Sequence, residues 1–563
     1  MSTTDIAPDT VANATLTESS VTTREPGATA ALAMWITSSD SKVIGRTFVG
    51  ASFLALVACA VLGVLLGLER VDGSDTLLDA SAIPQMFAAF RIGLVWGVMI
   101  PFLLGVAIAI VPLQVGARSL AFPRLALAGF WAWFAGLVLV VISLAANGGP
   151  GGGDADFVDL FLAAHGLLVC GLAAAAVSVA TTVLATRAPG LRMSRVPFFA
   201  WSAMIASIGL LLVLPVVLGV LIYLYVDHHN ARALFGGNVG IGSWIGFALT
   251  QPATYLFAVP AVGLTAELVP VTFRKRMPLR VAVYTGISLV GIAALSAVTQ
   301  QADHDLPWSG SGLSVDDFGN KFDDMLPYAL FTLVPILGVV MVMFLGAVAA
   351  RPASDAEAWV RPRITAAFVF AFFGLGMLLV GMLGGALVPI TDLGLQGTVF
   401  EEGVVVYVAY GTALAGLGAV AYWSPKWTGK LIPDKPLFGL ATLGMVATVL
   451  AALPYYVAGF ADQPAASGVY DYDGPSGLWN TLVTIGHALM AVVVLAFIGL
   501  WLRSSRSSGD DAGDDPWGGQ TLEWLTTSPA PTDNFLEVPT VMSPEPVLDL
   551  LGAEHADRGR SAR

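Results

Sequence analysis

The chain has 563 residues, of which 56% are hydrophobic and only 12% carry a charged side chain. Soluble domains average about 25% charged residues, so this composition excludes a soluble globular protein and indicates a polytopic membrane protein. The formal net charge of −13 argues against nucleic acid as a partner. The two cysteines, Cys59 and Cys170, lie in apolar stretches and predict neither a disulfide framework nor a cysteine metal site.

Residues 1–33 are rich in Thr, Ala and Ser with scattered acids, and no basic start precedes an apolar core. They predict a disordered N-terminal tail rather than a signal peptide. Residues 34–503 hold twelve apolar runs, each long enough to cross a bilayer as a helix. The runs are 46–68, 87–113, 125–146, 157–186, 197–226, 241–269, 280–301, 326–350, 364–389, 401–424, 436–460 and 477–502. Because they are continuous rather than alternating, they predict an all-α, twelve-helix membrane bundle and not a barrel.

Basic residues gather in the loops that follow every second span. These loops hold Arg118 and Arg124, then Arg187, Arg192 and Arg195, then Arg274, Lys275, Arg276 and Arg280, then Arg351, Arg361 and Arg363, and finally Lys426, Lys430 and Lys435. The alternate loops are nearly free of base, with Arg70, Arg232 and Lys321 as exceptions. Short loops rich in Lys and Arg stay on the cytoplasmic side, so we expect a multi-pass protein of the cell membrane with both termini cytoplasmic.

Residues 504–563 are polar and predict a cytoplasmic C-terminal tail. Residues 504–514 have the composition of a flexible linker. The next segment, 515–535, reads DPWGGQTLEWLTTSPAPTDNF, and its Pro and Gly residues exclude a long helix. We expect this segment to be ordered and docked on the cytoplasmic ends of the helices.

Four stretches resemble subunit I of the haem–copper oxidases, the catalytic subunit of cytochrome c oxidase. They are WITSSDSKVIG at 35–45, VPLQVGARSLAFPRL at 111–125, WSPKWTGKL at 423–431, and the tail segment 515–535. In the family they correspond to the start of the first helix, the loop after the second, the loop after the tenth, and the C-terminal tail. The resemblance implies a twelve-helix bundle with a pseudo-threefold arrangement of pores, haem and copper cofactors, and a place in aerobic respiratory electron transport.

The residues at the family's haem-ligand positions have changed. The stretch Gln396–Thr412, QGTVFEEGVVVYVAYGT, resembles the helix that carries two haem-ligating histidines in the family. The matching positions here are Val404 for the second haem and Val406 for the first. The opposite ligand of the first haem would fall at Phe90. Val and Phe side chains have no lone pair to donate to iron.

The other cofactor positions differ in the same way. The copper-ligand run of the family reads QPATY here, with Gln251 in place of the histidine and Tyr255 retained. The arginine pair that holds the haem propionates falls at Ala465 and Ala466. The family needs six ligating histidines, and this chain has six in all, with only two inside predicted spans, His165 and His487. We therefore predict no bound haem or copper and regard the cofactor sites as degenerate.

Two acids and an arginine appear close to the altered positions. Arg91 follows Phe90, and Glu402 precedes Val406 by one helical turn, with Glu401 beside it. A buried charge needs a partner, so we expect an ion pair between Arg91 and Glu402, or Glu401, across the first haem position. The alternative is that all three side chains extend to the membrane surface.

Three functions follow from these observations. The first is a non-catalytic paralogue, a pseudoenzyme that acts as an accessory or structural subunit in a lipid bilayer beside other oxidase-like subunits. The second is a functional terminal oxidase that passes electrons from cytochrome c to oxygen. The third is a proton- or ion-conducting membrane protein. The altered ligand positions favour the first.

Overall fold

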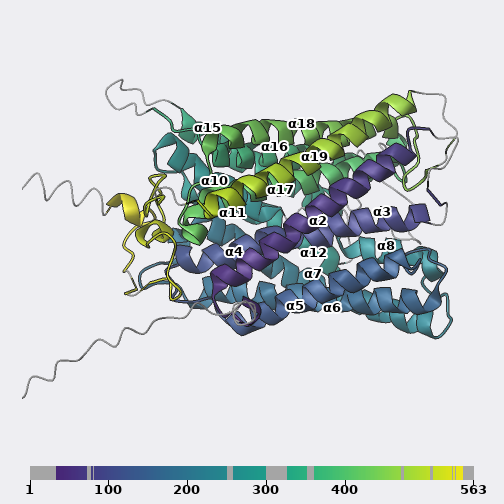
Figure 1. Ribbon diagram of the computed structural model, residues 1–563, viewed down its shortest axis with the longest axis horizontal. Coiled ribbons are helices and arrows are strands. Elements are labelled where there is room, and N and C mark those ends of the chain that lie inside the picture. Colours follow the sequence, from purple (N-terminus) through teal and green to yellow (C-terminus); the bar gives the residue numbers. More distant parts are fainter. Residues whose placement is uncertain are drawn as a thin grey trace, which may run out of the picture. The chain divides into compact units, whose positions relative to one another are not determined.

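The structure is a computed structural model. It describes residues 33 and 35–549 except for gaps at 73–77, 80–81, 250–257, 300–325, 352–360, 469, 471–474, 508–510, 536 and 539. The unit that begins at Ser39 is one bundle of long helices lying side by side (Figure 1). Gln251 and Tyr255 lie outside the described residues.

The helices follow the predicted order of spans. They are α2 (Ser41–Glu69), α3 (Ala82–Ile92) continued by the π-helix η1 (Gly93–Met99) and α4 (Ile100–Gln114), α5 (Pro123–Ala145), α6 (Ala155–Ala185), α7 (Phe198–His229), α8 (Gly237–Leu249), α10 (Val259–Phe273), α11 (Arg280–Gly291), α12 (Ala294–Thr299), η3 (Ala329–Leu333) continued by α15 (Val334–Ala350), α16 (Ala366–Leu387), α17 (Val399–Thr428), α18 (Asp434–Gly459) and α19 (Ser476–Ser505). Short 3-10 turns cover η2 (Met193–Arg195), η5 (Thr391–Leu393) and η6 (Leu522–Leu525).

Among the described residues, ten helices are long and apolar enough to cross a membrane. Two further apolar helices, Val259–Phe273 and Arg280–Ser296, are shorter and overlap the sixth and seventh predicted spans. The prediction of a multi-pass helical bundle is confirmed. Several predicted spans were shorter than the observed helices, because the helices continue beyond their apolar runs into polar caps and boundary residues.

Local chemistry explains where the helices begin and end. Asp40 caps α2 by accepting a hydrogen bond from the Lys42 amide at 2.9 Å, and Asp154 and Thr398 cap α6 and α17 in the same way. Helix α17 ends at Gly429, whose φ of +72° is the left-handed conformation that glycine adopts without strain. These caps fix the entry of each helix into the bundle.

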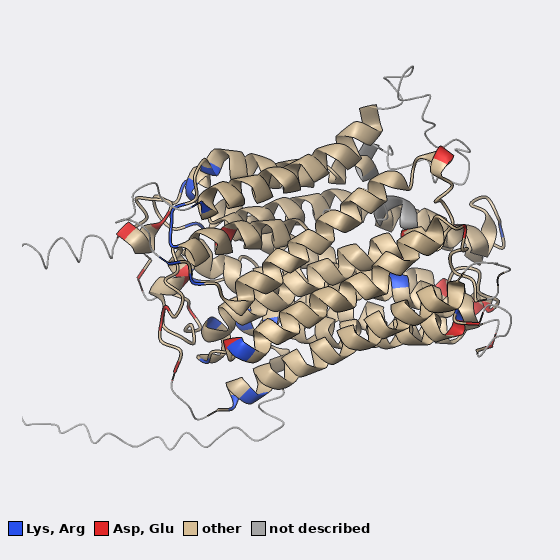
Figure 2. Ribbon diagram, turned by 90° about the horizontal axis from the view of Figure 1, so that it is seen from above, with Lys and Arg blue, Asp and Glu red and all other residues tan. Residues whose placement is uncertain are grey.

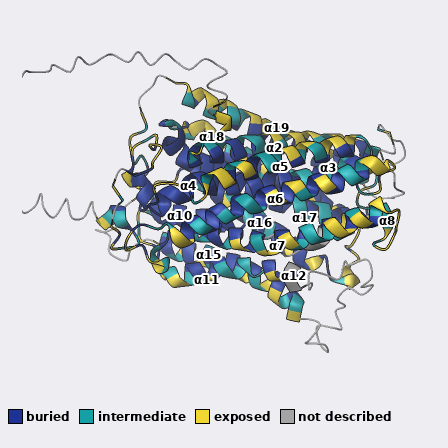
Figure 3. Cartoon of the chain, turned by 90° about the horizontal axis from the view of Figure 1, so that it is seen from below, coloured by how far each residue is buried: buried dark blue, intermediate teal, exposed yellow. Residues whose placement is uncertain are grey.

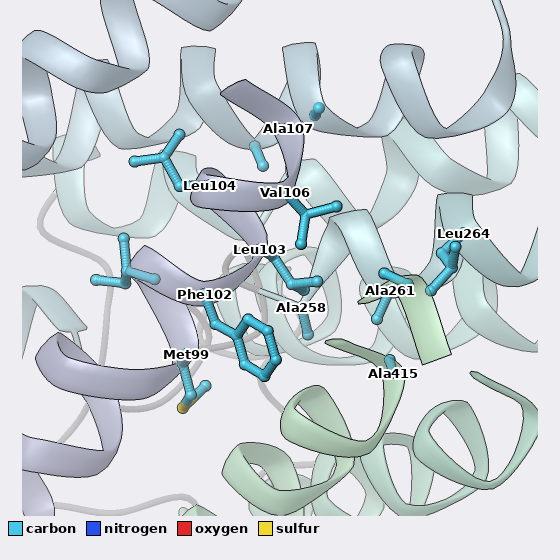
Figure 4. Packing of buried hydrophobic residues seen from close by; sticks show 14 of the residues in the cluster. Met99, Phe102, Leu103, Leu104, Val106, Ala107, Ala258, Ala261, Leu264 and Ala415 are labelled. Carbon is cyan, nitrogen blue, oxygen red and sulfur yellow. The ribbon is translucent and has the colours of Figure 1, made fainter. Parts of the chain in front are cut away.

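The second crossing and α17 form the centre of the bundle. In the most apolar window of Ala82–Gln114 every residue is buried, and in that of Val399–Thr428 89% are buried. Buried residues line the inner helices, and exposed ones mark the outward faces (Figure 3). Figure 4 shows Met99 of η1 and Phe102 and Leu103 of α4 in the same buried cluster as Ala261 of α10 and Ala415 of α17. Small residues let these backbones approach closely.

The polar tail covers one end of the bundle, here named the tail face. Trp517 Nε1 donates to the Tyr422 carbonyl at 2.9 Å. The buried Glu523 carboxylate accepts from Trp423 Nε1 at 3.2 Å and from Gln114 Nε2 at 3.1 Å. Helix α2 starts at this face, where Lys42 Nζ donates to Asn534 Oδ1 at 2.9 Å. Charged residues gather at this face and at the opposite one, here named the far face, with few between (Figure 2).

Candidate functional site

A buried ion pair joins α2 to α17 at the far face. Arg70, at the C-terminal cap of α2, meets Glu402 in the first turn of α17. The contact is bidentate, with Nη1–Oε2 at 2.7 Å and Nη2–Oε1 at 2.8 Å. The Arg70 side chain is 0% exposed and that of Glu402 17%. Two parallel charge-assisted hydrogen bonds of this kind are both strong and directional.

Further contacts complete the shell around Arg70. Its Nη1 donates to the Tyr455 hydroxyl at 2.9 Å and its Nε to the Ser467 carbonyl at 3.0 Å. The guanidinium carbon lies 4.2 Å from the centre of the Phe87 ring. Burial by itself lowers the Arg70 pKa, but Glu402 and then Tyr455 outweigh it and leave that pKa above its ordinary value. The site therefore holds a permanent cation whose three side-chain nitrogens all donate hydrogen bonds.

This arrangement corrects the predicted pairing. Glu402 forms its ion pair with Arg70, whereas Arg91 is exposed on α3. The Glu401 carboxylate accepts a hydrogen bond from the Gly397 amide at 2.8 Å. Arg91 shares the exposed side of α3 with Pro84, seven residues earlier, while Phe87 faces the pair. The sequence distinguished Arg70 only as a basic residue in a loop that is otherwise poor in Lys and Arg.

The loop after α18 also depends on Glu402. The backbone amide of Ala466 donates to Glu402 Oε1 at 2.9 Å, and that of Ala465 donates to the Gly397 carbonyl at 2.8 Å. The Val399 amide donates to the Gln463 carbonyl at 2.9 Å. Ala465 and Ala466 thus contribute their backbones to this site, and the loop is tied to the start of α17.

Aromatic rings fill the space beside Phe90. The Phe90 ring packs edge-on against the His487 imidazole at 5.4 Å, and the Tyr410 hydroxyl lies 2.7 Å from His487 Nδ1. Tyr410 is one helical turn beyond the fully buried Val406. A Cβ on Gly63 of α2 would lie 2.6 Å from the His487 ring, so the imidazole is pressed against the α2 backbone. The cluster leaves both Phe90 and Val406 enclosed by side chains.

A second aromatic group lies beside Val404. The Phe400 and Tyr456 rings stack with their centres 4.2 Å apart, and Tyr407 lies 5.2 Å from Tyr456. The Tyr456 hydroxyl donates to the Val380 carbonyl at 3.3 Å. Val404 is partly buried and packs against a small apolar cluster that contains Phe400. These tyrosines were not singled out from the sequence, which does not reveal the faces that α17 and α18 share.

A family model described as Cytochrome C and Quinol oxidase polypeptide I matches residues 43–489. The chain belongs to this oxidase subunit I family. It is 30% identical to a putative cytochrome c oxidase subunit 1-beta of Streptomyces coelicolor, over 92% of this chain and 91% of that protein. It is 28% identical to the corresponding protein of Streptomyces avermitilis, with 95% of each covered, and 27% identical to cytochrome c oxidase subunit 1 of Corynebacterium diphtheriae, with 92% and 91% covered.

The family implies haem and copper, and the described residues do not fit haem ligation at the expected positions. Phe90, Val404 and Val406 offer no nitrogen, oxygen or sulfur in their side chains. Across the part of the chain that the structure describes, no group of three His, Cys, Asp or Glu side chains could hold a metal ion. His165 is buried in α6, where its ring packs edge-on against Trp96 at 4.9 Å and Phe161 at 5.5 Å.

Proposed function

We propose that this chain is a non-catalytic member of the oxidase subunit I family that serves as a structural or accessory subunit of a respiratory membrane assembly. The observation that carries the proposal is the packing of Phe90 against His487, which in turn contacts Tyr410, so that an aromatic cluster lies at the expected site of the first haem. A haem there would need this cluster to open and a new donor atom to replace a hydrocarbon side chain.

The retained surfaces support a role as a subunit of an assembly rather than as a protein without partners. The tail still docks through Trp517 and Glu523, and the loops around it keep the family's sequence pattern. Such surfaces are where partner subunits of a membrane assembly would bind. By the distribution of basic loops, we propose that the tail face is cytoplasmic.

A second candidate is a functional terminal oxidase, which the names of the relatives favour. An optical spectrum and a metal analysis of the purified chain separate the two. For the non-catalytic subunit we expect no reduced-minus-oxidised haem band and far less than one iron per chain. A catalytic oxidase purified in the same detergent serves as the control that haem survives the procedure. Stoichiometric haem with oxygen consumption from reduced cytochrome c would establish the second candidate instead.

A further inference from the structure

An arginine faces outward from within a membrane-spanning segment. Arg91 lies nine residues into the 33-residue crossing Ala82–Gln114, and its side chain is exposed. Charged residues within spans usually face the interior of a bundle or a water-filled cavity, where they are paired. The outward position of Arg91 therefore calls for a partner outside this chain.

The surface around Arg91 is aliphatic. Gly93 packs against Cys59 of α2, and Gly97 packs against Leu137 of α5, so α3 and η1 lie between these two helices. Within two helical turns of these contacts, α2 exposes Val61 and Leu65, and α5 exposes Val141 and Ile142. Ala88, one turn before Arg91, is partly exposed. The Arg91 guanidinium therefore lies within an apolar surface that lipid acyl chains can contact.

The depth of Arg91 fits a phosphate at the far face. Phe87 contacts the Arg70 guanidinium, and Arg70 forms the far-face ion pair with Glu402. Arg91 follows Phe87 by four residues, which places its backbone about 6 Å deeper. A long arginine side chain can span such a distance and keep its head group at the polar boundary while its methylene groups cover apolar surface. The planar guanidinium binds phosphate through two parallel hydrogen bonds.

We propose that Arg91, with Val61, Leu65, Ala88 and Val141, binds one phospholipid molecule of the far-face leaflet. The phosphate contacts the guanidinium, and an acyl chain lies along the aliphatic surface. A carboxylate on the helix of another subunit would offer similar charge. The lipid is favoured because the flanking exposed side chains are hydrocarbon throughout, whereas a specific helix contact usually includes small or polar residues. This proposal does not depend on whether the chain is catalytic.

The test uses the full-length chain in dodecylmaltoside micelles with a photoreactive benzophenone amino acid at position 88. Phosphatidylglycerol is titrated in, and the yield of the lipid adduct is measured by mass spectrometry. We expect Arg91→Gln to weaken the apparent affinity about tenfold, in line with the loss of a charge-assisted hydrogen bond. Arg124→Gln, an exposed arginine at the tail face, should leave the titration at position 88 unchanged. Diacylglycerol, which has no phosphate, should bind as weakly to the parent as phosphatidylglycerol binds to Arg91→Gln.

Two results would overturn the proposal. One is an identical phosphatidylglycerol titration for the parent and Arg91→Gln. The other is a cross-link made in native membranes whose added mass is that of a protein, which would assign this surface to a partner subunit. If the substitution at position 88 prevents folding, the same probe at Val61, on the α2 side of the surface, gives an independent measurement.

Discussion

The ion pair at the far face gives the sharpest test of the fold. Glu402→Gln keeps the size of the side chain but removes the charge that neutralises Arg70, which is fully buried. Removing one partner of a buried pair costs about 3–5 kcal/mol, because the remaining charge stays out of water. Glu402 is 17% exposed, so water can relieve part of that cost. We therefore expect a loss near the lower end, about 3 kcal/mol.

The measurement is reversible unfolding of the purified chain in mixed micelles of dodecylmaltoside and SDS, followed by tryptophan fluorescence. Glu401→Gln is the matched control, since this neighbouring carboxylate accepts a hydrogen bond from the nearby Gly397 amide at the start of α17. We expect it to cost less than about 1 kcal/mol, the range for a weak or exposed contact. Arg70→Met and the double variant complete a cycle, and coupling between Arg70 and Glu402 should exceed about 1.5 kcal/mol. Equal losses for the two glutamates, or no coupling, would refute the reasoning.

Three further predictions concern the packing and the tail. Gly63→Ala should destabilise the chain by about 1–3 kcal/mol, because the added Cβ meets the His487 ring. Gly50→Ala should leave the stability unchanged, because the space around its Cβ is open. The same unfolding assay compares the two variants. Phe90→Ala should cost about 3–5 kcal/mol and open a cavity in which added benzene raises the melting temperature. Burial raises the pKa of Glu523, so protection of the tail from protease should be strongest below the ordinary value of 4.5 and decline as the pH rises through the folded-state value. In Glu523→Gln this decline should be smaller, and the part that remains comes from Asp515, whose pKa burial also raises.

The sequence predicted the helices well because membrane crossing is a local property. A run of apolar residues long enough to span the bilayer has few alternatives to a helix, whatever its neighbours are. The break between α11 and α12 at Ile292–Ala293 was not anticipated, since the residues there are as apolar as those around them. An ordered segment around Trp517 was predicted, but its hydrogen bonds to α17 could not be read from the sequence.

The candidate site shows where sequence reasoning stops. Glu402 was singled out because it lies one turn from Val406, which is a relation within one helix. The partner of Glu402 lies on another helix. The spacing of residues in the sequence predicts neither which side of α3 faces the bundle nor the depth at which α2 ends. Arg91 is close to Phe90 in sequence but turns outward, whereas Arg70 reaches Glu402 from the end of α2. The same limit applies to Tyr456, which meets Phe400 only after two helices have packed.

The far-face network also explains how the bundle could remain ordered without a haem, as we propose. In the family an arginine pair at the positions of Ala465 and Ala466 holds a haem carboxylate. Here the Glu402 carboxylate receives the Ala466 amide and the Arg70 guanidinium together, so the loop after α18 is still anchored by a carboxylate. Both partners of this contact are supplied by the chain. These protein contacts join the ends of α2, α17 and α18 whether or not a cofactor is bound, as the proposed structural subunit would require.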